Sequence, residues 1–201
     1  FIENLPKGAK IADLGCGTGG QTITLAQHTD AHITAIDLFP KFIDQLTEKS
    51  KEMHLEQQIT TQVRSMDNLP FREEELDLIW SEGAIYNIGF ERGIHEWRKY
   101  LKTDEYIAVS EVSWFTQSRP TEIEDFWMDA YPEINTISAK VRQMEEAGYT
   151  PVATFTLPEY CWLDEFYAPM VGSIPYFLEK YKDSEVAKEL VRNQQHEMNL
   201  Y

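Results

Sequence analysis

Cysteine, long apolar runs and basic residues are all scarce in this sequence. The 201 residues include two cysteines, Cys16 and Cys161, which are too few for a disulfide framework. No apolar run approaches the ~18 residues that a membrane-spanning helix needs. Eighteen lysines and arginines stand against 34 aspartates and glutamates, and the net charge of −16 argues against a nucleic-acid partner. We therefore expect a cytoplasmic protein that binds neither nucleic acid nor membranes.

The composition that remains is that of a folded globular protein. Hydrophobic residues make up 42% of the chain and aromatic residues 12%, so a core of ordinary size can form. The simplest explanation of the excess of acidic residues is a soluble surface whose charges repel one another. The same excess of negative charge would also suit a cationic ligand. The chain begins at Phe1 rather than Met, and we expect further residues upstream.

Strand-like and helix-like patterns alternate through the first two-thirds of the chain. This alternation predicts an α/β fold, a Rossmann-like sandwich with a mostly parallel sheet. The predicted strands are residues 10–14, 33–36, 59–63, 76–80 and 106–112, and helices are predicted at residues 20–28, at residues 40–53 and along the face of Ile94, Trp97 and Leu101.

The pattern loosens after residue 115. Residues 137–147 predict a helix that stops at Gly148, and residues 152–157 predict an outer strand. The last part has no linker before it and too few residues for a core of its own. We therefore predict one domain over residues 1–201, with a cofactor-binding core (1–115), the rest of the sheet and helices (116–159) and an added helical section on the substrate side (160–201), whose aromatics form its core or partly cover the substrate.

The most informative segment is Ile-Ala-Asp-Leu-Gly-Cys-Gly-Thr-Gly-Gly at residues 11–20. A glycine cluster between a strand and a helix lets backbone N–H groups approach a nucleotide or nucleoside closely. Gly15, Gly17 and Gly20 satisfy the dinucleotide pattern G-x-G-x-x-G, and Asp37 follows Gly15 by 22 positions. This pattern alone does not decide between a dinucleotide and another adenosine ligand.

Three further acidic segments separate these alternatives. Asp13 precedes the glycines at a strand end, Asp67 follows the third predicted strand, and Ser81 and Glu82 follow the fourth. All of them fall at carboxyl ends of parallel strands, where open α/β sheets bind ligands. Each aspartate also has a structural alternative: loop-amide binding for Asp13, a helix N-cap for Asp37 and a turn for Asp67.

With these motifs, residues 8–115 resemble the class I S-adenosylmethionine-dependent methyltransferases. The similarity is to their type 11 group, which includes ubiquinone and menaquinone C-methyltransferases and many small-metabolite enzymes. Asp-Leu-Gly-Cys-Gly-Thr-Gly at residues 13–19 matches the first motif of the family with high specificity, and Asp-Asn-Leu-Pro-Phe at residues 67–71 is fairly specific. The resemblance implies a class I methyltransferase sandwich, S-adenosylmethionine as cofactor and in-line methyl transfer to a small-molecule metabolite.

The resemblance also implies a role for each matching residue. The methionine end of the cofactor would lie against Asp13 and the loop of Gly15, Cys16, Gly17 and Gly19, with Ser81 near its amino group. Asp37 would accept hydrogen bonds from both ribose hydroxyls, because a carboxylate is an acceptor only. Leu38 would pack on the adenine, and Asp67 would accept from the adenine amino group with Met66 alongside.

Residues after the fourth and fifth predicted strands are candidates for the acceptor side. We expect Glu82, Glu111 and Tyr86 to be catalytic, the two glutamates serving as base or cation anchor. Asn87, Trp114 and Phe115 would contact the substrate, although the two aromatics suit ordinary packing equally well. No His, Cys, Asp or Glu cluster has metal-ligand spacing, so we expect no metal.

One segment departs from the family. Thr103, Asp104 and Glu105 stand where the family usually has a glycine pair, and Asp104 is expected to adopt left-handed backbone there. Two other functions stay open from the sequence alone: an NAD(P)-dependent oxidoreductase, and a protein that binds S-adenosylmethionine without catalysis. A homodimer is also left open.

Overall fold

The computed structural model describes residues 2 and 5–200. The chain divides into two compact units, Phe1–Val152 and Ala153–Tyr201, each of which is described by itself.

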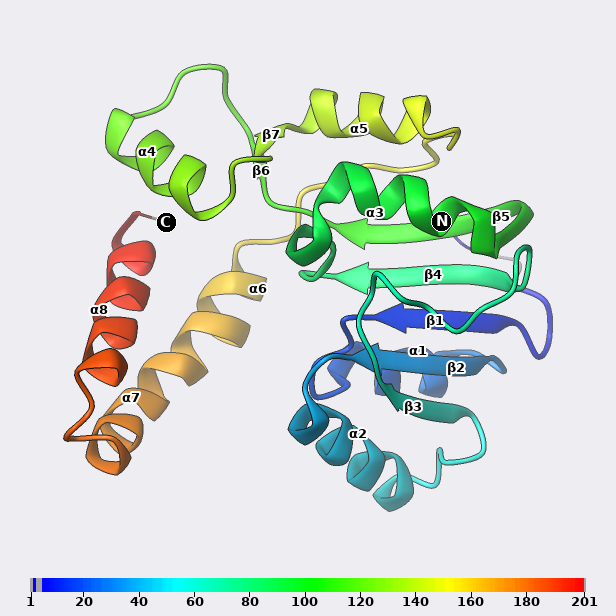
Figure 1. Cartoon of the computed structure of the whole chain (residues 1–201), viewed down its shortest axis with the longest axis horizontal. Coiled ribbons are helices and arrows are strands. Elements are labelled where there is room, and N and C mark those ends of the chain that lie inside the picture. Colours follow the sequence, from blue (N-terminus) through cyan, green and yellow to red (C-terminus); the bar gives the residue numbers. More distant parts are fainter. Residues whose placement is uncertain (1, 3–4, 201) are drawn as a thin grey trace. The chain divides into compact units, whose positions relative to one another are not determined.

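A five-stranded parallel sheet forms the centre of the first unit (Figure 1). Its strand order is β3-β2-β1-β4-β5, so the chain reverses direction across the sheet between β1 and β4. The predicted α/β fold with a mostly parallel sheet is confirmed. The strands are β1 (Lys10–Leu14), β2 (His32–Asp37), β3 (Ile59–Val63), β4 (Leu76–Glu82) and β5 (Leu101–Ser110).

Both faces of this sheet are covered by apolar residues, because β1, β2 and β4 are buried along nearly their whole length. Ile11 and Ile33 pack with α1 and α2 on one face, whereas Ala12, Leu14 and Ile36 pack with α3 on the other. The helices of this unit are α1 (Gly20–His28), α2 (Pro40–Glu52), α3 (Phe90–Trp97), α4 (Thr121–Ala130) and α5 (Ile137–Glu146), with short 3-10 turns η1 (Ile85–Ile88) and η2 (Arg98–Tyr100).

Two short strands, β6 (Ser113–Trp114) and β7 (Asn135–Thr136), form a separate parallel pair. They bring the segment after β5 beside the start of α5. Helix α5 ends near Gly148, whose φ of 87° allows the turn predicted there.

The fifth strand begins five residues earlier than predicted. Leu101, expected on the helix face of Ile94 and Trp97, pairs with Leu76 at the start of β5. The pairing then resumes between Leu78 and Tyr106, so residues 102–105 bulge out of register. Asp104 has a φ of 63° in this bulge, which confirms the expected left-handed backbone.

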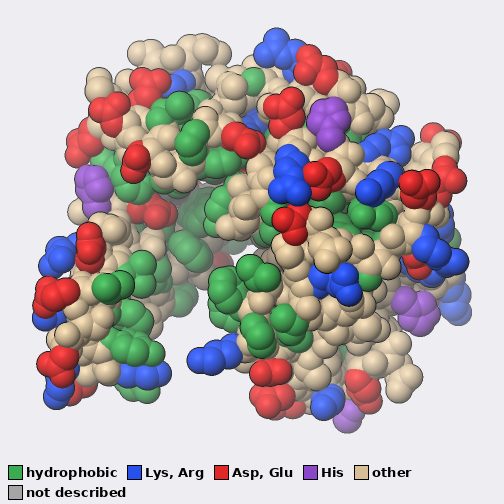
Figure 2. Space-filling view, viewed as in Figure 1, with side chains coloured by type: hydrophobic (Ala, Val, Ile, Leu, Met, Phe, Trp, Pro, Cys, Tyr) green, Lys and Arg blue, Asp and Glu red, His purple; other side chains and the backbone are tan. Residues whose placement is uncertain are grey.

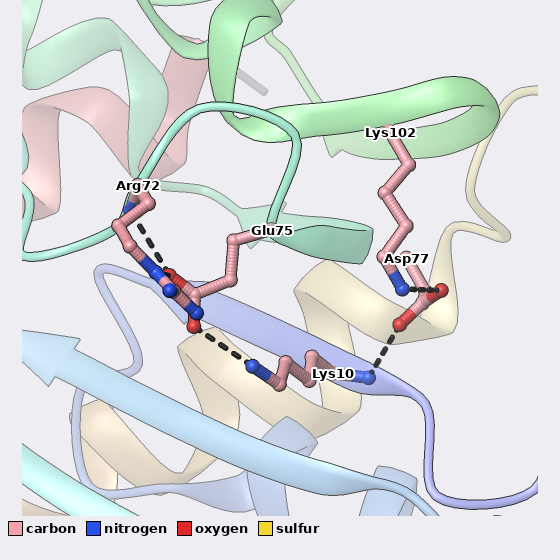
Figure 3. A network of polar contacts seen from close by, with 5 residues as sticks. All are labelled: Lys10, Arg72, Glu75, Asp77 and Lys102. Carbon is pink, nitrogen blue, oxygen red and sulfur yellow. Dashed lines mark hydrogen bonds and ion pairs between the residues drawn. The ribbon is translucent and has the colours of Figure 1, made fainter.

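A polar network fixes this bulge at the edge where the strands begin, which we call the amino edge (Figure 3). Asp77 is 3% exposed and accepts a hydrogen bond from the backbone N–H of Lys10 at 2.8 Å and another from Nζ of Lys102. Glu75 accepts from Nζ of Lys10 at 2.9 Å and from the backbone N–H of Arg72 at 3.0 Å. These hydrogen bonds lower the pKa of Glu75 to about 2.

The second unit is helical. It contains α6 (Tyr160–Trp162), a π-helical turn η3 (Leu163–Tyr167), α7 (Ala168–Lys180) and α8 (Glu185–Leu200). The hydroxyl of Tyr167 donates to Glu197 at 2.9 Å and ties η3 to α8. The outer strand predicted at residues 152–157 is wrong: this segment is exposed and pairs with no strand in the described part of the chain, so alternation alone did not make it a strand.

Candidate active site

The glycine turn after β1 lies at the opposite edge of the sheet, where the strands end, which we call the carboxyl edge. The backbone N–H groups of Gly15 and Cys16 donate to the carbonyl of Ile36 at 2.8 and 3.0 Å. Gly17 donates to Oδ2 of Asp37 at 2.9 Å. The turn is therefore attached to the end of β2, and Gly19 follows as the N-cap residue of α1.

Two of these glycines serve different purposes. A β-carbon at Gly15 would lie 2.3 Å from Cβ of Ala84, so this position is glycine because the loop after β4 packs against it. A β-carbon at Gly17 would meet no atom within 4 Å, and the φ of 55° at Gly17 still favours glycine. Gly17 is thus the position where the turn faces open space.

Asp13 is a buried acid whose carboxylate has few groups around it to stabilise its negative charge. Its side chain is 2% exposed and accepts a hydrogen bond from the hydroxyl of Thr22 on α1. The pKa of Asp13 is raised to about 6, chiefly by burial; the Thr22 hydrogen bond opposes this rise, and the nearby charges of Glu82 and Asp37 contribute to it. No lysine, arginine or histidine of the described residues forms an ion pair with Asp13.

Cys16 is also buried beside Asp13 and Asp37. Burial, reinforced by these two negative charges, raises the pKa of its thiol well above the ordinary value. The thiol therefore stays protonated and acts as a small packed side chain, as expected from the sequence.

Asp37 keeps part of its hydrogen-bonding capacity free. Oδ2 accepts from Gly17, and Oδ1 accepts from the backbone N–H of Phe39 at 2.9 Å. A carboxylate accepts about four hydrogen bonds, so about two positions stay open. The N-cap alternative is wrong, because Phe39 occupies the N-cap position of α2.

Exposed apolar side chains surround the start of α2. Leu38 is 60% exposed and Phe39 58%, and the ring of Phe39 contacts that of Phe42 at a centroid distance of 5.4 Å. Figure 2 shows hydrophobic side chains gathered on this part of the surface. Exposed apolar groups beside an open glycine turn favour binding of a flat aromatic ligand.

The structure also places the remaining predicted cofactor residues. Sδ of Met66 lies beside the glycine turn, 3.2 Å from where a Gly15 β-carbon would be. Asp67 is exposed, with Nη1 of Arg92 3.8 Å from its Oδ2. The hydroxyl of buried Ser81 donates to the carbonyl of Leu14 at 2.9 Å, so this side chain ties β4 to β1.

Glu82 lies at the carboxyl edge near Asp13. Its Oε2 accepts from Nε1 of Trp80 at 3.3 Å, and its charge contributes to the raised pKa of Asp13. Within the described ranges it forms no ion pair. Asp13 and Glu82 therefore leave negative charge at the edge where the turn is open.

Glu111, just after β5, lies in a buried network that the sequence analysis missed. Its Oε1 accepts from the hydroxyl of Tyr131 and from Nζ of Lys140 at 2.9 Å, and the two side chains of this ion pair are 7% and 5% exposed. Lys140 gave a usable signal: it stands on the apolar face of the predicted helix 137–147, three residues after Ile137 and four before Met144. Tyr131 gave none.

Two of the predicted catalytic residues meet at this network. The ring of Tyr86 contacts the ring of Tyr131 edge-on at 5.9 Å, and Tyr131 bonds Glu111. The predicted substrate residues are not gathered in the same way. Asn87 donates to the carbonyl of Ala84 at 2.9 Å, Trp114 stacks under Arg119 at 4.1 Å, and Phe115 is 72% exposed.

No group of three His, Cys, Asp or Glu side chains in the described ranges could hold a metal ion. None of the helices that the structure describes is long and apolar enough to cross a membrane.

Comparison with known proteins places this geometry in a family. Residues 11–104 match the family model described as a methyltransferase domain. The chain is 34% identical to dimethylglycine N-methyltransferase of Parasynechococcus marenigrum over 89 residues, which cover 44% of this chain and 32% of the relative. It is 24% identical to phosphoethanolamine N-methyltransferase 1 of Arabidopsis thaliana over 155 residues, covering 76% and 31%. The chain thus spans about a third of the length of these curated relatives.

A solved structure shares the fold. The S-adenosyl-L-homocysteine complex of a methyltransferase from Geobacter sulfurreducens has a TM-score of 0.82 and 20% identity, covering 98% of this chain and 79% of that one. The predicted resemblance is confirmed: residues 11–104 match a methyltransferase domain, and the chain has the fold of the class I S-adenosylmethionine-dependent methyltransferases, consistent with their type 11 small-molecule group.

Proposed function

We propose that this protein binds S-adenosylmethionine at the carboxyl edge and transfers its methyl group to a small-molecule metabolite. The observation that carries the proposal is the buried carboxylate of Asp13, which has no cationic partner in the described part of the chain and lies beside an open glycine turn. A buried acid without a cation is costly unless a ligand supplies the positive charge. The ammonium and sulfonium groups of S-adenosylmethionine would do so.

The other residues of this edge fit the same ligand. Asp37 has acceptor positions left for two ribose hydroxyls, and the exposed side chain of Leu38 offers an apolar surface to the adenine. Gly17 provides open space for the methionine end, and Asp67 would accept from the adenine amino group with Met66 beside it. The main chain at Ser81 would lie near the ligand's amino group.

Methyl transfer then depends on alignment and on the exclusion of water. The cofactor supplies an electrophilic methyl group on a sulfonium. Fixing the acceptor in line with that carbon contributes up to ~7–11 kcal/mol through entropy lost in advance of the reaction. Glu82 adds negative charge near the sulfonium, and Tyr86, Asn87, Trp114 and Phe115 are the candidate contacts of the acceptor.

The same charges disfavour the oxidoreductase alternative. Asp37 would suit the ribose of NAD equally well, but a pyrophosphate would lie close to the negative charges of Asp13 and Glu82. A binding protein without catalysis would have the same geometry, and a turnover assay distinguishes it from an enzyme.

We further propose an amine as methyl acceptor. The two curated relatives are named for N-methylation of dimethylglycine and phosphoethanolamine. The acidic edge suits such substrates better than nucleic acid. We also propose that the protein is located in the cytoplasm and that it forms a homodimer.

Calorimetric titration with S-adenosylmethionine, S-adenosylhomocysteine and NAD tests the cofactor. We expect the first two to bind, Asp37→Ala to weaken binding at least tenfold, and the exposed control Asp44→Asn on α2 to leave it unchanged. Binding of NAD alone would refute the proposal. Mass spectrometry of sarcosine, dimethylglycine and phosphoethanolamine incubated with cofactor then separates an enzyme from a binding protein.

A further inference from the structure

The buried network around Glu111 leaves one hydrogen-bonding atom unused. Oε1 of Glu111 accepts from both Tyr131 and Lys140, and Nζ of Lys140 also donates to the hydroxyl oxygen of Tyr131 at 2.9 Å. Nζ lies 4.4 Å from the centre of the Phe90 ring, a cation–π contact. Oε2 of Glu111 is buried and has no hydrogen-bond partner among the described residues. A buried acceptor without a donor is uncommon in folded proteins and calls for an explanation.

The charge of this network limits which chemical groups Oε2 of Glu111 can bind. Lys140 already neutralises Glu111, so the pair offers no net charge to a permanent cation. It offers a fixed acceptor, which suits an N–H or O–H group. Glu82, which has no such partner among the described side chains, is by contrast the better cation anchor.

The network also lies at the correct edge of the sheet. Ser110, the residue before Glu111, pairs with Glu82 across β4 and β5, and its hydroxyl accepts from the backbone N–H of Gly83 at 2.8 Å. Glu111 therefore follows the strand that ends beside Glu82. Tyr86, 46% exposed, is the accessible neighbour of the network through its contact with Tyr131.

We propose that Lys140 and Tyr131 are positioning residues that hold Glu111 by Oε1, so that Oε2 takes the proton from an N–H of the methyl acceptor. The inference rests on the proposed function. The nitrogen lone pair forms the bond to the methyl carbon, the carbon–sulfur bond breaks with its electrons going to sulfur, and the proton lost from nitrogen passes to Oε2. Because Oε2 is enclosed, a neighbouring side chain such as Tyr86 has to move as the acceptor enters.

Each group that faces Glu111 affects its ionisation in a known direction. Burial raises the pKa of Glu111, the hydrogen bonds from Tyr131 and Lys140 and the Lys140 charge lower it, and the charge of Glu133 raises it. Loss of either positioning residue should therefore raise the pKa of Glu111 further. A purely structural role would change stability and leave the function of Glu111 unaffected.

The test follows the carboxyl ¹³C signal of Glu111 against pH, assigned by its loss in Glu111→Gln. We expect Lys140→Met to move the titration midpoint upward by about one pH unit or more. Tyr131→Phe, which removes one hydroxyl and keeps the ring, should move it less but in the same direction. Lys51→Met on the exposed face of α2 is the matched control and should not move it. Unchanged midpoints in folded Lys140→Met and Tyr131→Phe would overturn the proposal.

Turnover of sarcosine and phosphoethanolamine tests the proton transfer itself. Glu111→Gln should lower kcat by about 10²-fold or more and leave S-adenosylhomocysteine binding unchanged. In Lys140→Met, the acid limb of kcat/KM should move to higher pH with the titration midpoint. Full kcat in Glu111→Gln would refute the role of Oε2. If the wild type binds S-adenosylhomocysteine and methylates neither amine, the amine acceptor is wrong, whereas the titration still decides the role of Lys140 and Tyr131.

Discussion

Two buried aspartates lie toward opposite edges of one sheet and have opposite surroundings. Asp77, at the amino edge, is held by a lysine side chain and a backbone N–H, and its charge is balanced within the fold. Asp13, at the carboxyl edge, has one hydroxyl partner and a raised pKa. The amino edge is therefore complete in itself, whereas the carboxyl edge has a charge that a ligand would balance. Equal burial thus marks an acid with its own partners in one place and, under the proposed function, a ligand-binding acid in the other.

The largest expected effect is on the structural acid. Asp77→Ala leaves Lys102 and the Lys10 N–H without their acceptor, and because Lys102 is partly exposed we expect a loss of about 2–4 kcal/mol in the free energy of unfolding. Urea denaturation measures this loss. Affinity for S-adenosylhomocysteine should stay within about twofold, and the exposed control Asp44→Ala should change neither quantity. A large loss of affinity in a folded Asp77→Ala protein would remove the contrast between the two edges.

The binding acid should show the reverse behaviour. Because the folded-state pKa of Asp13 is about 6 against an ordinary value of 3.8, the folded protein retains a proton that the unfolded chain has lost between these values. Stability from this group therefore falls as pH rises from about 4 to about 6 and stays lower above that. Asp13→Asn should remove this fall and stabilise the ligand-free protein at pH 7.5 by up to about 2–3 kcal/mol.

The same variant should bind S-adenosylhomocysteine at least tenfold more weakly at pH 7.5. In the wild type, affinity should rise with pH up to about 6 as Asp13 ionises. Calorimetry over pH 5–8 measures both, with Asp44→Asn as control. A variant that is less stable and binds normally would show that Asp13 is structural like Asp77.

The smallest expected effect on stability lies within the glycine turn. Gly17→Ala meets no atom within 4 Å, so its cost is the left-handed backbone alone, about 1 kcal/mol. Its effect on ligand affinity should be larger than this, because the new methyl group points into the open space. Gly15→Ala, which would clash with Ala84, should lose mainly stability. Thermal denaturation with and without S-adenosylhomocysteine separates the two outcomes.

The sequence predicted the parts that depend on local pattern. Local strand and helix patterns predicted the observed bounds of β1, β3 and α1, and the motifs at the strand ends carried the resemblance to the family. Residues 152–157 failed because alternation predicts a strand only where an edge is available to pair with. Leu101 failed because the bulge at residues 102–105 hides the true start of β5.

Local sequence patterns could not predict contacts between residues that lie far apart in the sequence. Tyr131 and Lys140 reach Glu111 from 20 and 29 residues away, and the β6–β7 pairing helps to bring their segments together. The sequence also did not reveal that Gly15 makes room for Ala84. A glycine motif identifies a ligand-binding turn without saying which of its glycines faces the ligand.

The contact between Gly15 and Ala84 has a consequence for protein engineering. The turn after β1 and the loop after β4 touch where neither has space for another methyl group. Enlarging position 84 would therefore displace the glycine turn as well. Tyr86 and Phe115, both exposed and both proposed to contact the acceptor, can be varied with Gly15 and Ala84 kept fixed, so that the turn is left undisturbed.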